Sequence, residues 1–214
     1  MLDIKIKKNN NFLNYRLLFN IEQNMEKISE PYTRLVNFDN HELFSKIILE
    51  QIVKIKKYLL IGTYNLQDIR LNLNNKFISL SDVLINLANK GVIIYFLIQP
   101  RAYKTKLITK LRNNIKNGNL RVKSCSRIHL KTIIIDLKLA YLGSANLTGF
   151  GLGTRSAMKR NFEIGLVTTE ESLIAQITRN FLNIFDGKYC NKKTCYYYNN
   201  FKSKRPCYGI NHQN

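Results

Sequence analysis

Apolar and polar residues follow two kinds of pattern along the middle of the chain. Apolar residues at every third or fourth position predict amphipathic helices, at residues 41–55, 80–89, 103–116 and 171–185. Short apolar runs between these segments predict strands, at residues 58–64, 92–98, 119–123 and 162–168, with two more strands running through Asp136 and Gly143. Helices that alternate with apolar strands predict an α/β layered fold, with a central mixed β-sheet flanked by helices.

One of these strands is apolar at successive positions. Ile133, Ile134 and Ile135 leave no polar face, which is typical of a strand that is buried on both sides. We therefore expect this strand to lie in the centre of the sheet.

The two ends of the chain differ from the middle. Residues 1–37 are interpreted as an extension with an amphipathic helix, because Leu18, Ile21, Met25 and Ile28 have helical spacing. Its polar face carries both signs of charge, which favours a docking helix over a membrane-surface helix. We expect a catalytic domain at 38–187 and a basic tail with cysteines at 188–214.

Composition limits the class of protein. A chain of 214 residues with 45% hydrophobic content is long enough for one sizeable core. The formal net charge is +20, and residues 101–131 contain ten Lys or Arg and no Asp or Glu. Such a field attracts polyanions, although a solvated basic surface is the alternative. Neither a signal peptide nor a membrane-spanning run is found, so a soluble, intracellular protein of the cytoplasm is expected.

Two pairs of polar residues stand close to the central strand. His129 and Lys131 are two positions apart, as are Ser144 and Asn146 past the following turn. Residues two apart in a strand project to the same face. The pattern predicts a cluster of one titratable nucleophile, one cation and two neutral hydrogen-bonding groups, which is suited to phosphodiester chemistry.

The complete spacing is His-x-Lys, four residues, Asp136, six residues, Gly143-Ser-x-Asn. It resembles the signature of the phospholipase D superfamily, in the branch of single-motif nucleases that includes bacterial endonucleases and the Zucchini or mitochondrial cardiolipin hydrolase type. The resemblance extends over roughly residues 40 to 186. It implies a phospholipase D-like fold with the motif histidine as nucleophile.

The resemblance also implies a mechanism and an assembly. One motif histidine attacks phosphorus to form a phosphohistidine, and a second protonates the leaving group. This chain carries the motif once, since His41 and His212 lack a Lys two residues on. A homodimer with His129 of both subunits at one site is therefore expected.

The other motif residues are assigned as follows. Lys131 is the candidate cation for the non-bridging oxygens, with Asn146 and Ser144 holding the phosphate. Asp136 lies seven residues from His129 and projects to the opposite face of an unbroken strand, so we favour a structural role, as for Gly143. Glu163 occupies the place where family members carry a carboxylate that orients the histidine; a solvent-facing charge at a strand start is the alternative.

Substrate binding is assigned to cations near the motif in sequence. Lys123 and Arg127 lead into the His129 strand, and a glycine-containing segment after Asn146 carries three more, at Arg155, Lys159 and Arg160. That segment is either a surface loop beside the site or an ordinary linker. Few acidic residues lie near the motif, so no cofactor or metal is expected for catalysis.

The C-terminal tail has its own cluster. Cys190, Cys195, Cys207 and His212 are separated by four, eleven and four residues, which is compatible with a structural zinc site. A disulfide and free thiols are the alternatives. Cys125 lies apart and is expected to be a small buried residue.

These patterns favour an endonuclease that hydrolyses DNA or RNA through a His129 phosphohistidine. A cardiolipin-type phospholipid hydrolase is the second hypothesis, and a non-cleaving nucleic-acid-binding protein is the third. The sequence does not distinguish DNA from RNA or single from double strands.

Overall fold

The computed structural model describes residues 30–37, 44–73 and 76–190, and these contain a seven-stranded mixed sheet. Strands β2, β5 and β6 are parallel, whereas β7, β8, β9 and β1 follow in antiparallel pairs. The order across the sheet is β1 (Thr33–Asn37), β9 (Ile164–Thr168), β8 (Leu139–Gly143), β7 (Lys131–Ile135), β2 (Tyr58–Thr63), β5 (Ile93–Ile98) and β6 (Leu120–Ser124). The predicted mixed sheet is confirmed.

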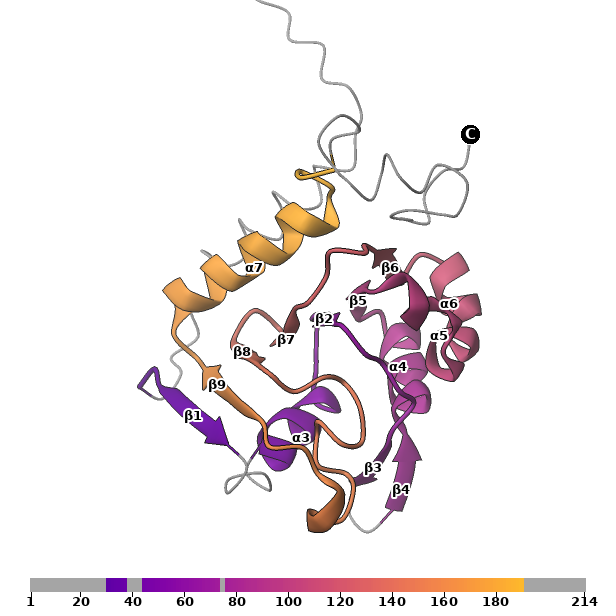
Figure 1. Ribbon diagram of the computed structural model, residues 1–214. Coiled ribbons are helices and arrows are strands. Elements are labelled where there is room, and N and C mark those ends of the chain that lie inside the picture. The colour runs from indigo at the N-terminus through magenta and orange to yellow at the C-terminus, as the bar shows by residue number, and fades with distance from the viewer. Residues whose placement is uncertain (1–29, 38–43, 74–75, 191–214) are drawn as a thin grey trace, which may run out of the picture.

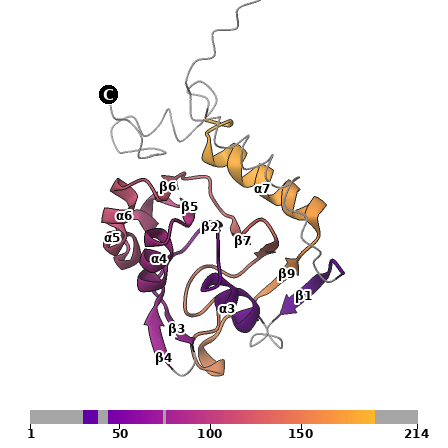
Figure 2. The same cartoon turned by 180° about the vertical axis from the view of Figure 1, so that it is seen from behind.

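Helices cover both faces of the sheet, as Figures 1 and 2 show. One face is covered by α7 (Glu171–Phe185), whose Ile174, Phe181 and Leu182 are buried against the sheet. The larger core lies on the other face, beneath η1 (Ser45–Leu49), α3 (Glu50–Ile52), α4 (Leu80–Asn89), η2 (Pro100–Lys104), α5 (Lys106–Lys110) and α6 (Arg112–Lys116). The layered α/β prediction is therefore confirmed.

Strand β7 lies in the middle of the sheet, as its sequence predicts. Ile133 and Ile135 join the core beneath α4, while Ile134 joins the core beneath α7. Their exposed fractions are 4%, 6% and 0%. A strand with neighbours on both edges and helices on both faces leaves no solvent-facing position over these three residues.

Several predicted elements differ in detail. The single helix expected at 103–116 is three short helices, interrupted at Thr105 and Leu111. At the first interruption the Thr105 hydroxyl donates to the Ala102 carbonyl at 2.8 Å, a side-chain bond that competes with helix continuation. Residues 44–52 are partly π-helical rather than uniformly α-helical.

Three strands were not predicted. A small hairpin of β3 (Arg70–Leu73) and β4 (Lys76–Ser79) leads into α4. Strand β1 lies inside the segment 1–37 that the sequence assigns to an extension, yet it pairs with β9 at the edge of the main sheet. The sheet therefore begins at Thr33. The amphipathic helix expected around residues 18–28 lies outside the described residues.

Candidate active site

Five of the predicted site residues converge at one end of the strands of the sheet: His129, Lys131, Ser144, Asn146 and Glu163. The parallel strands β2, β5 and β6 terminate at this end. Since β7 is antiparallel to β2, it begins there; β8 therefore ends there, and β9 begins there. Segments that follow or precede these strands meet at a common crevice, the usual place for ligands in open α/β sheets.

His129 and Lys131 lie side by side at the start of β7. The sequence predicts His129 within the strand, but it lies two residues before the strand begins. Its side chain is exposed. Nζ of Lys131 lies 3.0 Å from Nδ1 and 3.3 Å from Nε2 of His129, and it donates to the His129 carbonyl at 3.1 Å. Burial lowers the pKa of the Lys131 ammonium, and the charge of Glu163 opposes that shift.

A glutamine directly after β5 fixes the segment that carries His129. Nε2 of Gln99 donates to the carbonyls of Ser126 and Ile128, at 2.9 and 2.6 Å. These bonds tie the segment that precedes β7 to the end of β5.

An aromatic residue that the sequence analysis missed supports the pair. The Tyr64 and His129 ring centroids are 5.0 Å apart with an interplanar angle of 59°. The Arg101 guanidinium lies 4.0 Å from the Tyr64 ring centroid, and Nζ of Lys131 lies 5.8 Å from it. Tyr64 therefore links two cations and the histidine.

Ser144 and Glu163 form a tight pair on the adjacent strand ends. The Ser144 hydroxyl donates to Oε2 of Glu163 and accepts from the Ile164 backbone N–H at 3.0 Å. Asn161 donates to the other carboxylate oxygen at 3.1 Å. Because a hydroxyl carries one proton, Ser144 has none left for a phosphate, and the geometry favours a positioning role over the phosphate contact that was predicted.

The predicted hydrogen bond from His129 to Glu163 is absent from the described part of the chain. Both carboxylate oxygens are occupied by Ser144 and Asn161, and the ring of His129 faces Lys131 instead. Glu163 nevertheless acts electrostatically on Lys131. In the described part of the chain the carboxylate therefore belongs to the cluster without a hydrogen bond to the histidine.

Gly143 is required by close packing with a buried tyrosine. A Cβ at this position would collide with the Tyr141 hydroxyl and with the backbone of Ile164 and Gly165. The Tyr141 hydroxyl accepts from the Ala145 backbone N–H at 3.1 Å, and burial raises the pKa of Tyr141 to about 12. The glycine therefore lets Tyr141 support the turn that carries Ser144 and Asn146.

Asn146 is held by the segment that follows β2. Its Oδ1 accepts from the Asn65 backbone N–H at 2.9 Å, which orients its Nδ2 group as a donor. The glycine segment beyond it is not an ordinary linker, since Gly149, Gly151 and Leu152 are buried. A Cβ on Gly151 would come within 2.5 Å of the Asn146 carbonyl oxygen.

Asp136 lies at the opposite end of β7, away from His129. Its carboxylate accepts from the backbone N–H groups of Lys56, Lys57 and Tyr58, at 2.8, 2.7 and 2.9 Å. Its φ of 50° is tolerated well by aspartate in the turn to β8. The carboxylate joins the β7–β8 turn to the start of β2, which supports the structural role assigned from the sequence.

The five predicted substrate-binding cations are spread around the site. Arg127 is exposed two residues before His129, and Lys159 is exposed beyond the glycine segment. The Arg155 guanidinium lies 5.6 Å from the Phe150 ring, and Arg160 donates to the Arg155 carbonyl at 2.8 Å. Lys123 differs, because its Nζ lies beside Gly187 after α7, so it is not grouped with the motif.

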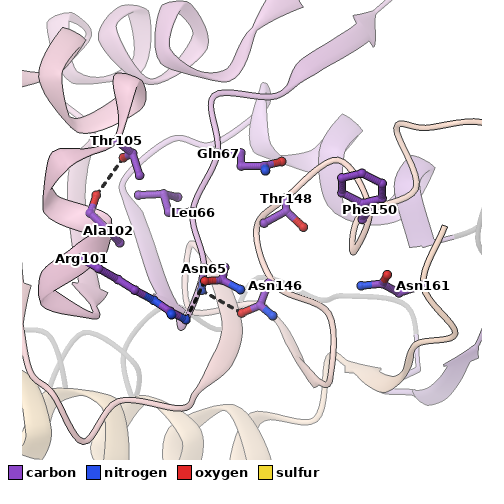
Figure 3. Close-up of a pocket in the computed structure, with 10 residues that line it drawn as sticks. All are labelled: Asn65, Leu66, Gln67, Arg101, Ala102, Thr105, Asn146, Thr148, Phe150 and Asn161. Carbon is purple, nitrogen blue, oxygen red and sulfur yellow. Dashed lines mark hydrogen bonds between the residues drawn. The ribbon is translucent and has the colours of Figure 1, made fainter. Parts of the chain in front are cut away.

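A pocket of about 480 Å³ opens next to the motif. Figure 3 shows Asn146 beside Asn65, with Arg101 reaching Asn65. Its lining consists mostly of amide, hydroxyl and aromatic side chains, from Asn65, Leu66, Gln67, Arg101, Ala102, Thr105, Asn146, Thr148, Phe150 and Asn161. The sequence pattern identifies Asn146 alone among them as a site residue.

The tail cluster falls largely outside the described residues. Cys190 is exposed, and Cys125 is buried. Cys195, Cys207 and His212 are not described, so the structural zinc site remains a prediction. Within residues 30–37, 44–73 and 76–190, no three His, Cys, Asp or Glu residues form a group able to hold a metal ion.

Among the helices of the described ranges, none combines the length and the apolar character needed to cross a bilayer.

Comparisons with known proteins agree with this geometry. The family model "Cardiolipin synthase, PLD-like domain" matches residues 48–185. The fold is similar to NucT from Helicobacter pylori, with a TM-score of 0.57 at 15% identity, over 73% of this chain and 97% of that one. It is also similar to Nuc from Salmonella typhimurium, a phospholipase D family member, with a TM-score of 0.51 at 18% identity, over 73% and 95%. At these identities the structural likeness establishes the fold alone. No curated protein matches the sequence.

Proposed function

Because the chain belongs to the phospholipase D-like family, whose members act as phosphodiesterases, we propose that it is a nuclease that hydrolyses DNA or RNA through His129. The observation that carries the proposal is the contact of Nζ of Lys131 with the imidazole of His129, 3.0 Å away at the converging strand ends. It pairs a nucleophile with a cation where a phosphate can approach both.

The proposed reaction proceeds in two displacements. A ring nitrogen of His129 attacks phosphorus, so that a P–N bond forms as the P–O bond to the leaving group breaks. The His129 of a second copy donates a proton to the leaving oxygen. Water then attacks phosphorus and gives a proton to the same second histidine, so that a new P–O bond forms as the P–N bond breaks. The product leaves, His129 recovers its electron pair, and the second histidine is protonated again.

The neighbouring groups have separate tasks in this scheme. Lys131 faces the negative charge on the non-bridging oxygens, where a fixed cation stabilises the transition state. Asn146 offers its Nδ2 group, since its oxygen is engaged by Asn65. Ser144 and Glu163 hold the start of β9 beside the site. No step requires a metal ion, so metal-independent cleavage is part of the proposal.

An apolar patch next to the site supports a homodimer. Leu166 lies directly opposite Leu35 and Leu142 on the neighbouring strands, and Ile164 is two residues away on the same face. These four side chains are 38–56% exposed. Ser144 bonds both backbone groups of Ile164, so a second copy on this patch would stand against the site. The proposed mechanism needs that copy, because one chain supplies one motif histidine.

The charge of the chain supports nucleic acid as the substrate. Cations surround the motif, at Arg101, Arg127 and Arg155, and the net charge is +20. A polyanion such as a nucleic acid can contact several of these cations at once, and each contact adds to its binding affinity.

In the deciding experiment, wild-type protein is incubated in parallel with four labelled substrates in the presence of chelator. The substrates are single-stranded DNA, duplex DNA, RNA and cardiolipin vesicles. Cleavage of a nucleic acid in chelator is expected. Turnover of the lipid alone would replace the nuclease by a phospholipid hydrolase, and binding of nucleic acid without cleavage would replace it by a binding protein. Nucleic-acid cleavage that chelator abolishes in folded protein would contradict metal independence.

A further inference from the structure

We propose that the amide-lined pocket beside the motif receives an unpaired nucleobase next to the phosphate that is cut. This inference rests on the proposed nuclease function and names the part of the substrate that the site recognises. The pocket is made by segments that follow β2 and β5 and by the glycine segment after β8 (Figure 3).

The chemistry of the lining matches the edge of a base. Bases present neutral donors and acceptors in one plane, which amide side chains pair with readily. Four amide side chains line the pocket, from Asn65, Gln67, Asn146 and Asn161. The nearby cation, Arg101, is already engaged by the Asn65 side-chain oxygen at 2.9 Å and by the Tyr64 ring.

Two of these amides are fixed in orientation. Oε1 of Gln67 accepts from the Gly149 backbone N–H at 3.2 Å, so its Nε2 group is the donor offered to a ligand. Oδ1 of Asn146 is fixed by Asn65 in the same way. Amides held by the backbone lose little entropy when a ligand binds, which favours recognition over nonspecific contact.

An aromatic side chain completes the pocket. Phe150 is 40% exposed, and the Arg155 guanidinium lies 5.6 Å from its ring. The backbone carbonyl of Phe150 accepts from the Asn161 N–H at 3.3 Å, and the Asn161 side chain donates to Glu163. Asn161 therefore connects this side of the pocket to Glu163. An aromatic face with a neighbouring guanidinium is a stacking platform for a base.

The position of the pocket links it to the reaction. Asn146 belongs both to the motif and to the lining, and Asn161 donates to Glu163 from the other side. A base in the pocket therefore belongs to a nucleotide that adjoins the phosphate at Lys131. Because a base within a duplex is paired and stacked, the substrate must present it unpaired or extrude it. A polar lining suits a base better than an acyl chain.

The test uses p-nitrophenyl phosphate esters of thymidine at its 3′ or 5′ oxygen, and the same esters of an abasic deoxyribose analogue. Wild type should turn over at least one thymidine ester about 5-fold or more faster in kcat/KM than its abasic counterpart. Gln67→Ala and Phe150→Ala should bring this ratio close to one. Matched controls are Gln176→Ala, exposed on α7, and Phe77→Ala, exposed on β4, which should keep the wild-type ratio.

A wild-type ratio near one for both esters, or a ratio that survives both pocket substitutions, would overturn the base pocket while leaving the nuclease proposal intact. A second measurement separates the two proposals if no cleavage occurs. His129→Ala protein should bind a single-stranded oligonucleotide more tightly than an abasic oligonucleotide of the same length. If wild type does not cleave but His129→Ala still prefers the oligonucleotide with bases, the nuclease proposal is wrong and the base pocket stands. Equal binding of the two oligonucleotides would contradict the base pocket.

Discussion

Nζ of Lys131 lies 3.0 Å from Nδ1 of His129, so the cation and the ring that would attack phosphorus are hydrogen-bonded before any substrate arrives. Burial lowers the pKa of this ammonium. A phosphate that enters the site offers its oxygens to the same ammonium. The contact therefore positions both groups around one phosphate.

The lowered pKa of Lys131 predicts an early alkaline limit of activity. As pH rises through that pKa, the ammonium loses its charge below the ordinary lysine value of 10.5. The alkaline limb of kcat/KM, which reports the free enzyme, should therefore begin below that value, and Lys131→Arg should move it upward because a guanidinium stays charged. Lys131→Met should lower kcat by about 10²–10³-fold. An alkaline limb that Lys131→Arg does not move would assign it to another group.

A shared active site predicts that inactive subunits act dominantly. In an equal mixture of wild type and His129→Ala, random pairing leaves about one quarter of dimers with two histidines. Activity after subunit exchange should fall toward that fraction of the wild-type value, not toward about one half. A linear fall with dilution would mean that each subunit works alone.

The apolar patch should control the same assembly. Leu166→Glu places a charge in the middle of the row with Leu35 and Leu142, and it should yield monomers with little activity. Phe77→Glu, at a side chain that is 69% exposed on β4, is the matched control. Light scattering reports the assembly. A dimeric and active Leu166→Glu variant would place the interface elsewhere.

Asp68 is expected to stabilise the start of α4 in a pH-dependent way. Its carboxylate accepts from the backbone and hydroxyl groups of Ser81, both at 2.9 Å, and pairs with Lys110 at 3.1 Å. Burial alone would raise its pKa, but these bonds outweigh it and the pKa lies below 3.8. Since the folded pKa is depressed, the stabilisation is present above about 3.8 and is lost as pH falls through the folded value.

Asp68→Asn should therefore reduce the free energy of unfolding by about 1–3 kcal/mol at neutral pH. The difference from wild type should shrink below the folded pKa, where both side chains are neutral. Asp82→Asn, which replaces an exposed carboxylate in the first turn of α4, is the control with a smaller effect. Urea unfolding across pH measures both. A difference that stays constant down to acid pH would argue against the carboxylate.

Asp136 should matter for stability more than for chemistry. Asp136→Ala removes the acceptor of three backbone N–H groups and should cost on the order of 2 kcal/mol. Asp136→Asn keeps one acceptor oxygen and tolerates the positive φ, so it should cost less. Both should retain activity below their unfolding temperatures. Loss of activity in fully folded Asp136→Asn would contradict a structural role.

Local pattern was sufficient for much of the fold. The helices at 80–89 and 171–185 have the predicted bounds, because each carries one apolar stripe against one sheet face. Strand β1 could not be found in this way. Its pairing with β9 spans more than a hundred residues, and a single apolar position facing the core leaves almost no periodic signal.

The same distinction between local pattern and long-range pairing applies to the site. The motif placed His129, Lys131, Ser144 and Asn146 together, and the structure brings them to one edge. Tyr64 and Arg101 were missed because they come from the ends of β2 and β5, far away in sequence. Their position directly after apolar parallel strands is the sequence feature that could have identified them as site residues. The Ser144–Glu163 bond was beyond sequence reasoning, since it depends on how β8 and β9 align.

The central claim is that His129 carries the chemistry, and substitution of individual histidines tests it most directly. His129→Ala and His41→Ala should be compared with wild type on the nucleic acid that proves to be cleaved, in chelator, with binding measured separately. The account predicts that His129→Ala binds but does not cut, while His41→Ala cuts as wild type does. Cleavage by folded His129→Ala at the wild-type rate would contradict it.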